Sequence, residues 1–397
     1  VLSFRKNDMS LLGMKIVVIG AGIAGLAVSR ALAMRGASVT VMEQACEITE
    51  VGAGLQISPN GFAVLDALGL GKTLAETAVQ AEAVSLRDYR KGEVTRLDLT
   101  RLQNRHYYFV HRADLIDLLA SGAREAGVKI RLLQHVKQVV SGPRPEVQLR
   151  SGTTLHPDLV IGADGLHSPT RTALNGADKP LFTNQVAWRT TIPNTLNLPP
   201  VARVHMGPGR HVVSYPLRQG KLINIVAVQE RHQWVEESWT HADTPDNLRS
   251  VFADFGPEVQ QMLDQVTEVK LWGLFRHPVA ANWHAENTAI LGDAAHPTLP
   301  FLAQGASMGL EDAWALAEEL SQTDDPNAGL AAFQARRRAR ACKVIDAASG
   351  NAWKYHLGFG PLRLAAHTAL KLGGAIAPGK MLHQFDWLYL HDETRRA

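Results

Sequence analysis

Apolar residues near the N-terminus follow a strand, helix, strand pattern. Residues 15–19 form a β-branched apolar run, residues 23–35 carry apolar side chains at helical spacing, and residues 38–43 form a second apolar run. This βαβ pattern predicts two parallel strands joined by a right-handed crossover. Short apolar runs at 159–161 and 289–291 lead into Gly/Asp turns, and we expect them to add strands to the same sheet.

The pattern changes in the middle of the chain. Between residues 181 and 284, segments such as HVVSYP and LINIVAV alternate with turns rich in proline and glycine, which indicates an antiparallel sheet. After residue 307 the pattern is helical almost to the end. The sequence therefore predicts an α/β fold in three parts: a Rossmann-like domain (14–80, 105–180 and 285–345), an inserted antiparallel-sheet domain (81–104 and 181–284) and a C-terminal helical segment (346–397).

Composition excludes several classes of protein. The 397 residues, 46% hydrophobic and 20% charged, are typical of a globular chain with one large domain or two domains that share a core. A formal charge of +3, from 41 basic and 38 acidic residues, argues against a nucleic-acid partner. Cys46 and Cys342 lack the spacing of metal ligands, so we expect no metal site and no disulfide framework.

These features predict a cytoplasmic protein without an integral membrane segment. The N-terminal residues lack the apolar core of a signal peptide. The most apolar late segment, 362–378, is too short to span a bilayer and is interrupted by charged residues, so we expect a packed helix there.

A glycine-rich turn follows the first predicted strand. Gly20, Gly22 and Gly25, with Ala24 between the last two, form a GxGxxG motif that opens the helix, so backbone amides and the helix N-terminus can hold a pyrophosphate. Glu43, 18 residues after Gly25, is placed to accept hydrogen bonds from an adenosine ribose. The combination favours nucleotide binding over a structural turn, but it does not distinguish FAD from NAD.

Two later motifs favour FAD. The segments DLVIGADGLHS (158–168) and AILGDAAHP (289–297) each run from a strand into a Gly/Asp turn. Together with the glycine-rich turn and Glu43, they resemble the FAD fingerprints of the class A flavoprotein monooxygenases, which have the p-hydroxybenzoate hydroxylase fold. The resemblance extends from Met14 to about Asp392 and is strongest to the salicylate hydroxylase and 3-hydroxybenzoate 6-hydroxylase group.

The resemblance implies a set of FAD-contacting residues beyond the glycine-rich turn. Each has a simpler reading: Asp293 could cap a turn, Asp164 could belong to an ordinary Asp-Gly turn, and Arg112 could lie on the surface of an amphipathic helix. In the context of the family, the residues that would contact FAD are Arg112, Asp164, Gly292, Asp293, Gln304 and Gly305.

On the substrate side, period-2 alternation in a strand at 211–218 places His211 and Tyr215 on one face. The resemblance implies that both line a ring pocket where a phenol is activated, although both could instead be core residues with backbone partners. Pro300 would approach the flavin, with its carbonyl free to accept a hydrogen bond, or it could be an ordinary loop proline. Tyr107 and Arg189 are further pocket candidates. The sequence WRTT at 188–191 departs from the Arg-Gly pair of close relatives, which leaves the substrate open.

The resemblance thus implies an FAD-dependent monooxygenase that hydroxylates a phenolic acid with O2 through a flavin C4a-hydroperoxide. The chain has one complete dinucleotide fingerprint, so NADH or NADPH would bind transiently. Two alternatives remain: a hydroxylase of a bulkier or lipid-tailed ring, as in quinone biosynthesis, and a non-oxygenating flavoprotein reductase. The expected partners are a small aromatic substrate and O2, and the oligomeric state, for which a homodimer is one candidate, stays open.

Overall fold

The computed structural model describes residues 11–48, 53–102, 105–231, 233 and 242–395. A six-stranded sheet forms the first domain, and its neighbouring strands are parallel except at the β19 edge. Its strand order is β19 (His284–Ala285), β20 (Thr288–Ile290), β12 (Leu159–Gly162), β1 (Lys15–Ile19), β2 (Ser38–Met42) and β8 (Lys129–Arg131). The βαβ unit and the two added strands are confirmed.

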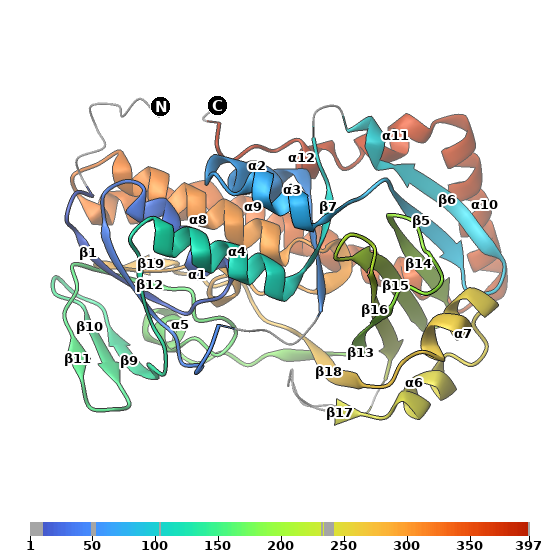
Figure 1. The fold of residues 1–397 in the computed structure, drawn as a ribbon, viewed down its shortest axis with the longest axis horizontal. Helices are drawn as coiled ribbons and strands as arrows, with labels where there is room; N and C mark the ends of the chain where they lie inside the picture. Colours follow the sequence, from blue (N-terminus) through green and yellow to red (C-terminus); the bar gives the residue numbers. More distant parts are fainter. Residues whose placement is uncertain (1–10, 49–52, 103–104, 232, 234–241, 396–397) are drawn as a thin grey trace.

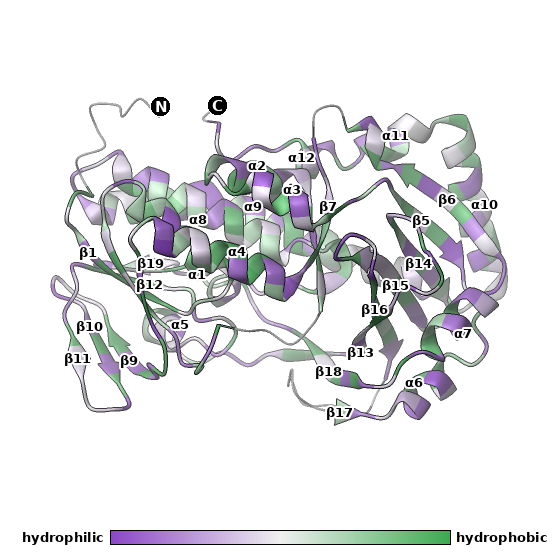
Figure 2. Cartoon of the chain, viewed as in Figure 1, coloured by the Kyte–Doolittle hydropathy of each residue, from purple (hydrophilic) through white to green (hydrophobic). Residues whose placement is uncertain are grey.

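Different layers cover the two faces of this sheet (Figure 1). Val18 points toward helices α1 (Ile23–Ala33), α4 (Arg112–Glu125) and α8 (Gly305–Ser321). Val17 and Ile19 point the other way, toward a small sheet of β9 (Val136–Val140), β10 (Glu146–Leu149) and β11 (Thr154–Leu155). Both faces are therefore apolar, as expected for strands of a covered parallel sheet. Figure 2 shows hydrophilic and hydrophobic residues alternating along α4, whose apolar side faces the protein.

An eight-stranded sheet forms the second domain. Its order is β17 (Ala242–Asp243), β18 (Val269–Arg276), β13 (Leu181–Pro193), β16 (Leu222–Glu230), β15 (Arg210–Leu217), β14 (Val201–Gly207), β5 (Ala83–Asp88) and β6 (Gly92–Asp98). The pairs are antiparallel except β14 with β5, which is parallel. Strand β5 arrives from a distant part of the chain, so no tight hairpin forces it to run antiparallel to β14.

The second sheet has one face against helices and one face toward the first domain. Trp188, Val212 and Ile225 pack with residues of α6 (Pro245–Val251) and α7 (Pro257–Leu263). A three-stranded sheet, β3 (Gly54–Ile57), β7 (Tyr108–His111) and β4 (Val79–Gln80), lies beside the opposite face, with α2 (Pro59–Ala67) and α3 (Gly71–Thr77) nearby. The Gly54 amide donates to Asn224 Oδ1 at 2.6 Å and so joins β3 to β16.

The C-terminal part differs from the expected pattern. Helix α9 (Pro326–Tyr355) runs without interruption across the boundary suggested at 345–346. The segment expected to be a packed helix forms α10 (Gly360–Ile376), which packs on the edge strand β6 and on α11 (Pro378–His383) but has no buried residue. Side chains such as Leu364 and Ile376 are 62% and 80% exposed, so the expectation of close packing is wrong. Among the described residues, no helix is long and apolar enough to cross a membrane.

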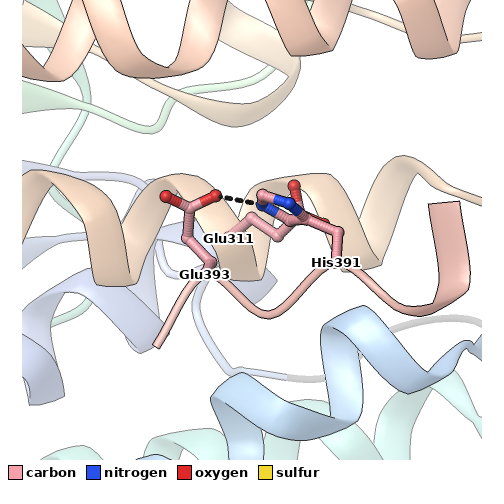
Figure 3. Close-up of side chains that lie close together, drawn as sticks. All are labelled: Glu311, His391 and Glu393. Atoms are coloured by element: carbon pink, nitrogen blue, oxygen red, sulfur yellow. Dashed lines mark hydrogen bonds and ion pairs between the residues drawn. The ribbon is translucent and has the colours of Figure 1, made fainter. Parts of the chain in front are cut away.

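Buried charges connect α8, α9 and the segment after α12 (Asp386–Tyr389). The guanidinium of Arg337 contacts Glu311 at 2.6 Å, Asp312 at 2.8 Å and Glu393 at 2.7 Å, and all four side chains are almost fully buried. Figure 3 shows Glu311, His391 and Glu393 close together, with a hydrogen bond from His391 to Glu393. Although these groups are close enough to hold a metal ion, arginines already neutralise both carboxylates. We interpret the cluster as a structural ion network.

Candidate active site

A cavity of about 1050 Å³ lies between the two large sheets. Residues from both domains line it, so it forms only when the inserted domain is folded onto the first. All site residues predicted from the sequence except Gly25 and Gln304 line this cavity, namely Gly20, Gly22, Ala24, Glu43, Tyr107, Arg112, Asp164, Arg189, His211, Tyr215, Gly292, Asp293, Pro300 and Gly305.

The glycine-rich turn forms one end of the cavity. Gly20 has φ +100°, and a Cβ added there would lie 2.5 Å from the Ala163 carbonyl oxygen. A Cβ at Gly25 would lie 2.1 Å from the Gly20 carbonyl oxygen, so Gly25 serves helix packing. A Cβ at Gly22 would meet no protein atom and would project into open space beside the cavity. The positive N-terminal end of helix α1 therefore faces this open space. A side chain at residue 22 would narrow the space.

Glu43 joins the end of β2 to this turn. Its carboxylate accepts hydrogen bonds from the backbone amides of Ala21 at 2.7 Å and Ala45 at 2.8 Å. The carboxylate is thus fixed at the cavity wall. A contact with a ribose stays a prediction, and a carboxylate has enough lone pairs to accept such bonds as well.

The N-terminal part of α8 packs against the N-terminal part of α1 at Ala24. Added Cβ atoms at Gly292 and Gly309 would lie 3.0 and 3.1 Å from Ala24 Cβ, so small residues let α1 and α8 approach closely. The neighbouring Asp293 lines the cavity and is exposed to it. Burial raises the pKa of Asp293, while the positive charges of His296 and Arg112 oppose that rise.

Two of the expected FAD contacts use their side chains elsewhere. The Asp164 carboxylate accepts from the Thr170 amide at 3.1 Å, from the Thr170 hydroxyl at 2.7 Å and from Ser168 Oγ, so it fixes the start of α5 (Pro169–Asn175). The Gln304 amide is buried and bonds to Ser58 Oγ at 2.9 Å and Asn60 Nδ2 at 3.1 Å. Any cofactor contact of Asp164 would therefore use its backbone, and Gln304 lies behind the cavity wall.

The substrate end of the cavity is the face of the eight-stranded sheet. His211, Val213 and Tyr215 alternate on β15 and all line the cavity, as the period-2 pattern predicts. His211 Nδ1 lies 2.6 Å from Nε2 of His356, so its partner is a side chain and not the backbone. Burial, followed by the positive charge of His356, holds the pKa of His211 well below its usual range.

Tyrosines and Gln56 line the wall next to His211. The hydroxyl of Tyr107 donates to Gln56 Oε1 at 2.7 Å, and Tyr215 also bonds to Gln56. Burial raises the pKa of Tyr107 and of Tyr215, so both keep their hydroxyl protons at neutral pH and can donate hydrogen bonds.

Arg189 carries positive charge on the same sheet face. Its guanidinium lies 4.1 Å from the centre of the Trp272 ring, an arrangement typical of a cation–π contact, and burial lowers its pKa to about 10. Arg189 is opposite Val226, which is opposite Val213. Two strand spacings of about 4.8 Å therefore separate its backbone from the strand that carries His211 and Tyr215.

The loop from 297 to 305 forms the wall near the N-terminus of α8. Pro300 begins the 3-10 turn Pro300–Leu302, and its carbonyl accepts a hydrogen bond from the Ala303 amide at 3.0 Å. The Pro300 carbonyl thus has one donor within its own loop, and its approach to the flavin stays a prediction. Ala303 has φ +53°, a left-handed conformation that is uncommon for alanine, so the packing around the loop must hold it there.

Sequence patterns missed several residues of the substrate end. His356, Glu230 and Gln56 belong to no motif, and Tyr355, Trp272 and Tyr389 lie on segments with no local chemical signature. His356 follows the end of α9 and lies 145 residues from His211 along the chain. Only the fold brings these residues together.

Comparisons with known proteins agree with this site. A family model described as an FAD binding domain matches residues 13–348. A 3-amino-4-hydroxybenzoate 2-monooxygenase of Streptomyces platensis is 31% identical, covering 94% of this chain and 95% of that protein. A 3-hydroxybenzoate 6-hydroxylase of Aquipseudomonas alcaligenes is also 31% identical, covering 94% and 97%. The chain belongs to the FAD-dependent aromatic-ring monooxygenases.

Solved structures show that this monooxygenase also has the fold of such flavoproteins. A salicylate hydroxylase in complex with substrate superposes with a TM-score of 0.81, at 24% identity and over 96% of each chain. HpxO of Klebsiella pneumoniae, in complex with FAD and uric acid, gives a TM-score of 0.81 at 25% identity, over 93% of this chain and 96% of that one. The α/β fold predicted from the sequence, with its inserted second sheet, is confirmed.

The residues of the monooxygenase fit FAD. The turn at Gly20 and Gly22 and the N-terminus of α1 offer amide donors to a pyrophosphate, and Glu43 offers an acceptor beside them. Asp293 supplies a cavity-facing carboxylate, and the N-terminus of α8 at Gly305 supplies a partial positive charge at the far end. These donors, the acceptor and the partial positive charge are spread along one long cavity, as a bound dinucleotide requires.

We expect Gly22→Ala to weaken FAD binding about tenfold without changing the fold, because the added methyl group occupies the space where a pyrophosphate would approach the backbone. Titration of the apoprotein with FAD, followed by flavin fluorescence, measures the change. Gly25→Ala is the comparison: its Cβ would collide with the Gly20 carbonyl, so thermal stability without FAD should fall as well. Equal FAD affinity in Gly22→Ala and the native protein would contradict this assignment.

Proposed function

We propose that the enzyme hydroxylates an aromatic ring that carries a phenolic hydroxyl and a carboxylate. The observation that carries this proposal is one cavity face with His211 and Tyr215 on β15 and Arg189 two strands away. A neutral imidazole and a tyrosine hydroxyl suit a phenol, and a guanidinium suits a carboxylate.

FAD, reduced by NADH or NADPH, would supply the activated oxygen atom from O2. The glycine-rich turn, Glu43, Arg112 and Asp293 would hold the cofactor, and the Pro300 loop would separate it from the substrate end. The protein's own contribution at the ring is position and proton transfer. Val204, Val213 and Val226 line the sheet face around the ring and limit the access of water.

His211 would remove the proton of the phenol. Its low pKa keeps the imidazole neutral at neutral pH, which leaves a lone pair to accept that proton. Tyr215, whose hydroxyl stays protonated, would donate a hydrogen bond to another polar group of the substrate, because it is four residues from His211 along an extended strand. A ring oxygen that gives up its proton raises the electron density of the ring, which favours attack on an electrophilic oxygen.

One observation favours a second candidate, a ring with an apolar tail. Leu370 on α10 and Met381 on α11 line the cavity, and α10 exposes several large apolar side chains on the outside of the protein. A tail could leave the cavity along this helix. Arg189 favours the smaller acid, because its guanidinium lines the same cavity as His211 and suits a carboxylate.

A panel of phenolic acids tests the choice. Salicylate, 3-hydroxybenzoate and 4-hydroxybenzoate, each beside its carboxamide, are incubated with FAD-loaded enzyme, O2, and NADH or NADPH, and the products are separated by chromatography. We expect at least one acid to be hydroxylated and its carboxamide to have a KM about tenfold higher or more, since the amide lacks the charge for Arg189. Hydroxylation of long-chain phenols only would support the second candidate, and hydrogen peroxide as the only oxygen product would refute both.

Location and assembly are further proposals. We infer that the enzyme works in the cytoplasm, supported by its two unpaired cysteines, of which Cys46 is exposed. We also propose a homodimer, for which the exposed apolar side chains of α10 offer a surface. Light scattering of the purified enzyme distinguishes a dimer from a monomer.

A further inference from the structure

A chain of three side chains leads from the cavity to the protein surface. His211 lines the cavity, and its Nδ1 lies 2.6 Å from Nε2 of His356. The other ring nitrogen of His356, Nδ1, lies 2.9 Å from Oε1 of Glu230. The side chain of His356 is 1% exposed, whereas that of Glu230 is 52% exposed, so the chain runs from a buried wall to solvent.

The chemistry of the three groups fixes the direction of their hydrogen bonds. An ionised carboxylate has no proton to donate, so Glu230 must accept from Nδ1–H of His356. A neutral His356 then has its lone pair on Nε2 and accepts from Nδ1–H of His211. His211 is left with its lone pair on Nε2, the nitrogen available to a molecule in the cavity. An exposed carboxylate thus sets the tautomer of a buried base through a second histidine.

The backbone holds the chain in place independently of these side chains. Gly209, in the turn between β14 and β15, donates its amide to the His356 carbonyl at 3.1 Å and accepts from the Glu230 amide at 2.8 Å. The segment after α9 is therefore attached to the sheet at the point where the three side chains meet. Substitution of His356 or Glu230 leaves these backbone bonds available.

We propose that His211, His356 and Glu230 form a relay that carries the proton of a cavity-bound phenol to solvent. This inference rests on the proposed function. The phenol O–H bond breaks as Nε2 of His211 takes the proton. His211 then passes its Nδ1 proton to Nε2 of His356. His356 in turn passes its Nδ1 proton to the Glu230 carboxylate, which exchanges it with water. The phenolate remains in the cavity, and no group ends as a buried cation. His356 and Glu230 act through His211 and are positioning residues.

The surroundings suit such a relay. Among the described residues, the charged or titratable groups recorded beside the two imidazoles are Glu230 at the outer end and the phenol of Tyr355, whose ring centre lies 5.4 Å from that of His211. Burial lowers the pKa of His356 as well as that of His211, so neither imidazole stores the proton. A path that ends at an exposed acceptor avoids an imidazolium in the cavity wall.

The test uses FAD-loaded enzyme and 4-nitrophenol, whose ionisation changes its absorbance. The variants are His356→Gln, His356→Phe and Glu230→Gln, with Glu268→Gln as a matched control, since Glu268 is an exposed acid at the edge of the same sheet. Glutamine at 356 can accept from His211 and donate to Glu230, so it preserves the orientation of His211 but cannot pass a proton. Difference spectra give the pKa of the bound probe, and steady-state assays give kcat and KM for the hydroxylated acid.

We expect both His356 variants to raise the pKa of bound 4-nitrophenol by about one unit or more, a tenfold weaker ionisation. The kcat of both His356 variants should fall about tenfold or more, while their KM changes little. In Glu230→Gln the pKa of the bound probe should rise and kcat should fall as well, whereas Glu268→Gln should match the native enzyme in both. If His356→Gln behaves as the native enzyme, His356 only orients His211 and the relay is refuted. If the native enzyme ionises the probe in a His356-dependent way but hydroxylates no ring, the proposed function fails and the relay stands.

Discussion

His211→Phe is expected to lower kcat for hydroxylation by about 10²- to 10⁴-fold, the usual effect of losing a general base. Phenylalanine fills a similar volume in the cavity wall, so FAD content should change little, while thermal stability should fall modestly because Nε2 of the buried His356 loses its partner. KM should also change little if Arg189 and the apolar wall carry most of the binding. Steady-state kinetics, with product measured by chromatography, tests the prediction.

His211→Asn is the matched variant. Its amide can donate to Nε2 of His356 in place of Nδ1–H, but it offers no basic nitrogen to the cavity. We expect the same loss of kcat as in His211→Phe. An asparagine variant that retains most of the native kcat would show that His211 only fills space and positions neighbouring groups.

The pH profile gives an independent check on His211. A histidine is a base in its neutral form, which predominates above its pKa. Because burial and the charge of His356 hold the pKa of His211 well below its usual value of 6.5, kcat should not fall as the pH decreases through 6.5, and the acid limb should appear at lower pH. An acid limb near 6.5 that disappears in His211→Phe would contradict the proposed environment.

Arg337→Leu is expected to destabilise the protein by about 3–5 kcal/mol, because it removes the one cation that contacts all three buried carboxylates. Arg337 is fully buried between Glu311, Asp312 and Glu393, which belong to two segments packed against α9. Urea unfolding, followed by circular dichroism, measures the difference. Arg338→Leu, one residue away and exposed, is the control and should change the free energy of unfolding by less than about 1 kcal/mol.

The effect of Arg337→Leu should depend on pH. Burial alone would raise the pKa of Glu311, but Arg337 and Arg340 hold the pKa at about 2, below the usual value of 4.5. A carboxyl whose pKa is lowered on folding contributes stability above its unfolded pKa, and this contribution is lost as the pH falls toward the folded pKa. The difference between native and Arg337→Leu should therefore be largest near neutral pH and decrease between about pH 4.5 and 2. A difference that is constant over this range would contradict the ion-network interpretation.

The sequence by itself determined the local parts of the enzyme. Turn chemistry required Gly20 after β1, helical spacing defined α1, and alternation along β15 placed His211 and Tyr215 on one face. Each of these features depends on residues close together in the chain, where periodicity and backbone conformation act directly. The family resemblance then indicated FAD and the cavity residues of the first domain.

Only the tertiary structure decided which side chains meet at the substrate end. The partner of His211 is His356, 145 residues away, and Arg189 lies over Trp272 on a neighbouring strand. The structure also turned the carboxylate of Asp164 toward α5 and the amide of Gln304 toward Ser58. Each polar side chain takes the partner that packing brings within reach, because a buried polar group must be satisfied. Local sequence patterns carry no information about such partners, which depend on how the two sheets and the C-terminal helices pack together.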